Sequence, residues 1–179
     1  MNQTYIALLR GINVGGRNRL PMDDLVEAMQ DLGAENVRTY IQSGNAAFEY
    51  AGNLPGGFSA RLAEVIELRK GFAPQVLVLT LDRLEHSAVR NPFPEAEDKP
   101  KSLHVFFLAF KPPDPDMQAL EEARAESESF RLEGAVFYLH APDGIGRSRL
   151  AAGVERALGV SATARNWRSV QKILEMAGG

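Results

Sequence analysis

The predicted elements follow the same order in both halves of the chain: strand, helix, strand, strand, helix, strand. Continuous apolar runs predict strands covered on both faces. Apolar residues at helical spacing, closed by Gly33, Gly71 or Gly159, predict helices. The expected elements are Thr4–Arg10, Pro21–Leu32, Val37–Gln42, Asn45–Tyr50, Phe58–Lys70 and Gln75–Leu81 in the first half, and Leu103–Phe110, Asp114–Ala125, Glu128–Glu133, Ala135–His140, Ser148–Leu158 and Ala162–Arg165 in the second.

This order is that of the ferredoxin-like β-α-β-β-α-β unit. The predicted fold class is therefore α+β, a tandem of two ferredoxin-like units plus a C-terminal helix that Asn166 caps. The first unit is expected over residues 1–90, including a short helix at Asp82–Val89. Residues 91–101 are rich in proline and acids and are expected to form a linker. The second unit is expected over residues 102–179.

Composition restricts the class of protein. A chain of 179 residues with 45% hydrophobic and 24% charged residues can bury a sizeable core and is typical of soluble globular proteins. No apolar run approaches the roughly 18 residues of a membrane helix, and the N-terminus lacks a signal-peptide pattern. The absence of cysteine excludes disulfides, thiolate catalysis and cysteine-ligated metals. We therefore expect a cytoplasmic protein with no membrane partner.

Charge is distributed unevenly along a chain whose formal net charge is −3. Several acid-free segments contain arginine, and Arg156–Leu174 is the longest of those in the second half. Acidic residues concentrate in Asp114–Glu133 instead. This pattern allows one cationic face on an acidic protein, although surface charges also cluster by chance.

The strand Thr4–Arg10 leads into a glycine-rich loop, Gly11–Asn18, with the two-glycine spacing of a P-loop. Arg17 and Asn18 replace the Lys and Ser/Thr of that motif, which argues against a true P-loop. A looser anion-binding nest of backbone amides is more consistent with the sequence. The alternative is a tight loop whose glycines only permit positive φ. The candidate ligand-binding residues here are Arg10, Gly11, Asn13, Gly15, Gly16 and Arg17.

Three further segments are candidate ligand contacts. Gln42, Ser43 and Asn45 flank Gly44 in the expected hairpin, which we expect at the opposite end of the sheet from the glycine loop. Gly146, Arg147 and Ser148 precede a helix that Ser148 is expected to cap, so an anion could bind there or the turn could be purely structural. Arg165, Asn166 and Arg168 adjoin Trp167, and the two arginines could stack on a base or bind a carboxylate. We interpret Trp167 as a core residue because apolar residues follow it at helical spacing.

Catalytic patterns are scarce. The three histidines are scattered with no i, i+4 pair, so we expect no metal site, and no cofactor is indicated. No Gly-x-Ser-x-Gly motif occurs, and no general base stands out. The sequence leaves open whether there is catalysis.

Together, Ala7–Gly16 and Val37–Asn45 resemble a mainly bacterial family catalogued as domain of unknown function 1697. Asn91–Phe93, Gly144–Ser148 and Thr163–Trp167 continue the resemblance, which spans essentially the whole chain. One departure is that arginine stands at 17 and 19 where lysine is common in the family. The resemblance implies an α+β fold with internal duplication. It implies no reaction, cofactor or catalytic residue.

The predicted function is a soluble binding module for a phosphate-bearing ligand, either a nucleotide or nucleic acid. An enzyme acting on a phosphorylated or carboxylate-bearing metabolite is an alternative, and a non-catalytic interaction protein is another. The negative net charge and the lack of an aromatic RNA-binding pattern argue against nucleic acid.

Overall fold

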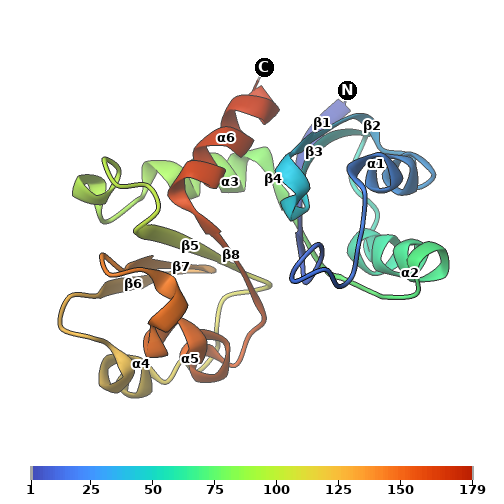
Figure 1. Cartoon of the computed structure of the whole chain (residues 1–179). Coiled ribbons are helices and arrows are strands. Elements are labelled where there is room, and N and C mark those ends of the chain that lie inside the picture. The colour runs from blue at the N-terminus through green and yellow to red at the C-terminus, as the bar shows by residue number, and fades with distance from the viewer. Residues whose placement is uncertain (1, 179) are drawn as a thin grey trace. The chain divides into compact units, whose positions relative to one another are not determined.

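The computed structural model describes residues 2–178, which form two four-stranded antiparallel sheets and six α-helices (Figure 1). Three short 3₁₀ turns, η1–η3, complete the regular structure. In chain order the elements are β1 (Asn2–Arg10), α1 (Met22–Gln30), β2 (Glu35–Tyr40), η1 (Ile41–Ser43), β3 (Asn45–Ala51), α2 (Phe58–Lys70), β4 (Gln75–Thr80), α3 (Leu81–Val89), η2 (Pro94–Ala96), β5 (Leu103–Leu108), α4 (Met117–Ala123), β6 (Ser129–Glu133), β7 (Val136–His140), η3 (Ile145–Arg147), α5 (Arg149–Leu158), β8 (Ala162–Asn166) and α6 (Trp167–Gly178).

The chain divides into two compact units. The first unit comprises Met1–His86 together with Lys172–Gly179, and the second comprises Ser87–Gln171. The division therefore passes through α3 and α6. Residues 91–101, expected to be a linker, belong to the second unit, and Ala96 within η2 is buried.

In the first unit the strand order is β2-β3-β1-β4, with β1 antiparallel to both of its neighbours. Helices α1 and α2 lie side by side on one face of the sheet (Figure 1). Ala7 and Leu9 belong to the core that the sheet forms with these helices, while Ile6 and Leu8 on the opposite face are also buried. The prediction of a strand covered on both faces is confirmed for β1.

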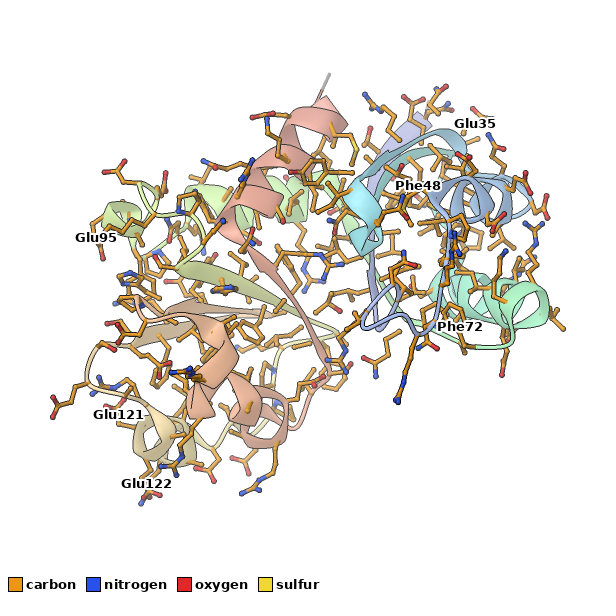
Figure 2. All side chains as sticks on the ribbon, viewed as in Figure 1. Glu35, Phe48, Phe72, Glu95, Glu121 and Glu122 are labelled. Carbon is orange, nitrogen blue, oxygen red and sulfur yellow. The ribbon has the colours of Figure 1, made fainter. Side chains whose placement is uncertain are left out.

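The core of the first unit lies between its sheet and the helix pair. Phe48 of β3 (labelled in Figure 2) is fully buried there. Its ring stacks on that of Phe58 at the start of α2, with ring centroids 5.3 Å apart. Leu25 and Met29 of α1 complete this layer. Because α1 and α2 bury their apolar faces together against the sheet, they fix the loops that precede them.

The second sheet has the order β6-β7-β5-β8, so β5 occupies the position that β1 has in the first. Helices α4 and α5 pack together on one face (Figure 1). Phe137 of β7, Leu120 of α4 and Leu150 of α5 belong to the core between them. Every residue of β5 is buried, which explains why all of its residues except His104 are apolar.

Element boundaries differ from the expected ones where capping and turn geometry decide them. Helix α4 covers only Met117–Ala123 because the Asp116 carboxylate caps it, accepting from the Ala119 amide at 2.9 Å. Strand β2 ends at Tyr40, two residues before the expected end, because η1 occupies the connection to β3. The predicted caps of α5 and α6 are confirmed, since Ser148 Oγ accepts from the Ala151 amide and Asn166 Oδ1 from the Ser169 amide.

None of the helices within residues 2–178 has the length and apolar character needed to cross a membrane.

Gly44 is the position where a side chain would be least tolerated. Its φ is +74°, and an added Cβ would lie 2.7 Å from Leu9 Cβ and 2.8 Å from Ile12 Cδ1. We expect Gly44→Ala to lower the free energy of unfolding by about 2–4 kcal/mol, from left-handed strain plus overpacking. Gly15→Ala is the matched control, since Gly15 has φ +57° but open space around it. It should cost about 1–2 kcal/mol. Urea denaturation of both variants measures this, and equal losses would contradict the packing argument.

His104 of β5 generates a pH prediction. Its side chain is buried, and burial lowers its pKa, with the Ser102 backbone acting in the opposite direction. Because the folded pKa lies below the unfolded one, the unfolded state binds the proton first, so stability should fall as the pH drops below about 6.5. His104→Phe should flatten this dependence in thermal melts between pH 5 and 7.5. An unchanged slope would show that groups other than His104 cause the pH dependence of stability.

Candidate functional site

The glycine-rich loop after β1 is a tight hairpin. The Arg17 amide donates to the Val14 carbonyl at 3.0 Å, and Gly15 and Gly16 between them have φ of +57° and +74°. Positive φ at both central residues with this hydrogen bond defines a type I′ turn. The turn therefore requires both glycines. This agrees with the alternative considered from the sequence, that the glycines serve only to permit positive φ. The Arg17 amide points back into the loop.

Two asparagines hold the same loop from inside. Asn13 Nδ2 donates to the carbonyls of Leu20 (2.9 Å) and Gln42 (2.8 Å), while Asn13 Oδ1 accepts from the Leu20 amide. Asn18 Nδ2 donates to the Gly11 carbonyl at 2.8 Å. Both asparagines have positive φ. These bonds make Asn13 and Gly11 part of the loop's own framework.

The turn between β2 and β3 lies at the same end of the sheet as the glycine loop, so the expectation of opposite ends was wrong. Antiparallel pairing of β1 with β3 sets Leu8 opposite Asn45, and the Leu9 amide donates to the Gly44 carbonyl at 2.8 Å. The crossover through α1 makes β2 parallel to β1, so both strands end at one edge. The bond from Asn13 to the Gln42 carbonyl joins the two loops directly.

The predicted residues of the first unit differ in exposure: Gly11, Gly15, Gly16, Arg17 and Gln42 are exposed. Arg17 is exposed at the tip of the hairpin, and Arg10 at its base is half-buried. Asn45 is completely buried. The side chain of Ser43 lies outside what the structure describes. Arg17, with the exposed Arg19 and Val14, thus forms the accessible cationic tip of the first unit.

In the second unit, the loop after β7 leads through η3 into α5. Gly146 and Arg147 are exposed, whereas Ser148 is buried and committed to its cap. Asn166 is likewise committed to capping α6. Burial lowers the pKa of Arg165 to about 10, and an Arg165 Nη1 group donates to the Ala164 carbonyl. Trp167 is only 3% exposed, as its interpretation as a core residue requires.

A pocket of about 520 Å³ lies in the second unit and is called the basic pocket here. Its walls come from the turn before β5, the turn after β7 and the first turn of α6. The lining residues are Lys99, Pro100, Lys101, Ser102, Ala141, Pro142, Asp143, Gly144 and Arg168. Two of the segments predicted from sequence reach this pocket: the loop before η3 through Gly144, and the segment Arg165–Arg168 through Arg168.

Backbone hydrogen bonds fix the walls of the basic pocket. The Ser102 amide and hydroxyl both donate to the Lys99 carbonyl at 2.8 Å. The Ala141 amide donates to the Ser102 carbonyl at 2.7 Å, and the Trp167 amide to the Pro100 carbonyl at 3.1 Å. Three segments distant in sequence are thereby held together, so the pocket is preformed.

The electrostatics of the basic pocket favour an anion. Lys99, Lys101 and Arg168 line it, and none of them forms an ion pair with any residue in the described range 2–178. Asp143 is the single lining carboxylate, and its Oδ2 accepts from Ser127 Oγ at 2.7 Å. Within residues 2–178 no group of three or more histidine and carboxylate side chains is placed to hold a metal ion.

A smaller pocket of about 360 Å³ adjoins the basic pocket and is called the arginine cleft. It contains Arg147 and Ser148 from the predicted set, together with Arg149. Sequence reasoning missed Lys99 and Lys101 because they stand in a proline-rich stretch interpreted as a linker. The signal available was the acid-free Lys99-Pro100-Lys101 directly before a strand.

Arg168 stands where its charge opposes the helix dipole. It lies in the first turn of α6, whose backbone amides carry partial positive charge. We expect Arg168→Gln to raise the free energy of unfolding by about 0.3–1 kcal/mol, since a cation is removed from a helix N-terminus. Arg156→Gln is the matched control, because Arg156 lies in the last turn of α5, where a cation is favourable. Removing it should lower the free energy of unfolding by a similar amount. Thermal denaturation at low salt measures both, and stabilisation by neither or by both would contradict the dipole argument.

Comparison with known proteins agrees with the fold and adds no activity. A solved structure, that of conserved bacterial protein SP0830 from Streptococcus pneumoniae, is similar with a TM-score of 0.68 and 21% identity, over 99% of each chain. This likeness shows the fold alone. No curated protein matches the chain. The family model described as Protein of unknown function (DUF1697) matches residues 1–138, up to β7, and stops before the resembling motifs at 144–148 and 163–167. The chain therefore belongs to this DUF1697 family.

Proposed function

We propose that the protein binds a small phosphate-bearing organic molecule, of the nucleotide class, in the basic pocket of its second unit. The observation that carries the proposal is the convergence of Lys99, Lys101 and Arg168 on one concave pocket without ion-pair partners in residues 2–178. Lys and Arg side chains form the strongest hydrogen bonds to phosphate oxygens.

The pocket walls support an organic ligand in preference to a bare anion. Pro100, Ala141 and Pro142 add apolar surface to the lining. A volume of about 520 Å³ is within the range of small-molecule sites. A base or similar flat ring packed on the prolines, with its phosphate among the cations, would satisfy both parts of the lining.

The fold supports a binding role only by analogy. We infer that both units are ferredoxin-like, because each combines the β-α-β-β-α-β order with a four-stranded antiparallel sheet in which the first and third strands are central. Such folds serve many functions, so the site carries the functional argument. For the first unit, the contribution of Arg10, Gly15, Gly16 and Arg17 to anion binding stays a prediction, as does a cytoplasmic location.

The test uses adenosine 5′-monophosphate (AMP) as the probe, titrated calorimetrically into the full-length protein. The double substitution Lys101→Ala with Arg168→Gln should weaken binding by at least about a hundredfold, since each charge-assisted hydrogen bond contributes about 1.5–3 kcal/mol. The control is Lys111→Ala with Arg156→Gln, which removes the same charge from exposed sites outside the pocket. It should leave affinity within about threefold.

Two outcomes would contradict the proposal. One is the absence of AMP binding by the unmodified protein. The other is equal weakening by the two double variants, which would mean that net charge and not the pocket determines binding. Salt-sensitive binding of a single-stranded oligonucleotide without AMP binding would favour the nucleic-acid hypothesis and direct attention to Arg17 and Arg19.

A further inference from the structure

The basic pocket and the arginine cleft share Asp143 and Gly144 in their linings. The two pockets therefore meet at one turn, the one between β7 and η3. The Gly144 amide donates to the Ala141 carbonyl at 3.0 Å, which fixes this turn. Asp143 thus lines both pockets, and each pocket also has cations in its lining.

The arginine cleft has cations available for a ligand. Arg147 and Arg149 line it, and neither forms an ion pair with another residue of the described chain. They belong to one wall, at the start of α5. The other wall comes from the end of α4 and the loop before β6.

The carboxylates of that second wall are occupied locally. Glu122 Oε1 accepts from Gln118 Nε2 at 2.8 Å, and the buried Glu128 accepts from the Ala125 amide at 3.0 Å. Arg124 donates to Glu121 and to the Glu128 carbonyl, and the Glu121 carboxylate raises its pKa. Figure 2 shows Glu121 and Glu122 projecting outward from α4. Within the described chain, Arg147 and Arg149 are thus the arginines of the cleft that form no ion pair, and both lie on one wall.

Asp143 determines what can lie between the two cationic regions. A carboxylate repels a phosphate placed against it, and it accepts hydrogen bonds from hydroxyl groups. In the structure it accepts one such bond, from Ser127 Oγ. A ligand hydroxyl could therefore donate to the same carboxylate, whose two oxygens have capacity for several donors.

We propose that the basic pocket and the arginine cleft form one elongated site for a ligand with two separated phosphate groups joined by a hydroxyl-bearing segment, as in a nucleoside 3′,5′-bisphosphate. This inference rests on the proposed function, since the first phosphate occupies the basic pocket. The second phosphate binds Arg147 and Arg149. The hydroxyl of the intervening sugar donates to Asp143, which is a specificity-determining residue.

Calorimetric titration with three probes tests the inference. The probes are AMP, adenosine diphosphate and adenosine 3′,5′-bisphosphate; the last two carry two phosphates each, adjacent in one and separated in the other. The 3′,5′-bisphosphate should bind at least about tenfold more tightly than AMP, from one additional charge-assisted contact, and more tightly than the diphosphate. Arg147→Gln with Arg149→Gln should abolish this gain and leave AMP affinity within about threefold.

A fourth probe examines Asp143. The 2′-deoxy form of the 3′,5′-bisphosphate should bind the unmodified protein several-fold more weakly, because one hydrogen bond to the carboxylate is lost. Asp143→Asn should reduce this discrimination. Circular dichroism and melting temperatures of all variants establish that they are folded.

The outcomes separate the two proposals. Failure of AMP to bind the unmodified protein overturns the proposed function and this inference with it. AMP binding with no preference for the 3′,5′-bisphosphate over the diphosphate overturns this inference alone. The same conclusion follows if the preference survives substitution of Arg147 and Arg149.

Discussion

Burial of a central strand on both faces is the constraint on which the structure of each unit depends. Strand β1 is buried from Tyr5 to Leu9 and β5 along its whole length, and a buried strand must pair its backbone groups on both sides. Each therefore lies between two antiparallel neighbours. Short connections and helices packed on one face of the sheet link the strands. The strand order, and the end of the sheet at which each loop emerges, therefore follow from the pairing of the central strand.

The same constraint creates the candidate site of the second unit. The turn before β5, the end of β7 and the end of β8 meet at one edge of the sheet because β5 is antiparallel to both neighbours. The Ser102–Ala141 and Pro100–Trp167 backbone bonds join these three segments into one wall. Cations carried on them, Lys99, Lys101 and Arg168, consequently line a single pocket. Their separation in sequence gave no indication of this convergence.

The two glycine-containing loops illustrate different uses of similar sequences. In the first unit, Gly15 and Gly16 form a type I′ turn, and the amides of Asn13 and Arg17 donate to carbonyls of the loop itself, so these two N–H groups do not face an anion. The result is an exposed tip bearing Arg17. In the second unit, Gly144 precedes a 3₁₀ turn and a capped helix, which leaves Arg147 and Arg149 beside a concave surface. This concavity is why we propose the second unit, and not the glycine-rich loop of the first, as the place where a ligand binds.

Local interactions made much of this structure predictable from sequence. The order of strands and helices, the burial of β1, the bounds of α2 and the caps Ser148 and Asn166 were all predicted, since each depends on residues within a few positions of one another. The family was predicted as well, because its characteristic motifs are short stretches of consecutive residues.

Tertiary structure alone decided the rest. The glycine loop and the β2–β3 turn meet because strands paired far apart in sequence end at the same edge, and Asn45 is buried for the same reason. The basic pocket is a convergence of residues 99–102, 141–144 and 168. Sequence patterns report the periodicity and capping of a single element. Which loops become neighbours depends on long-range strand pairing, which only the folded chain establishes.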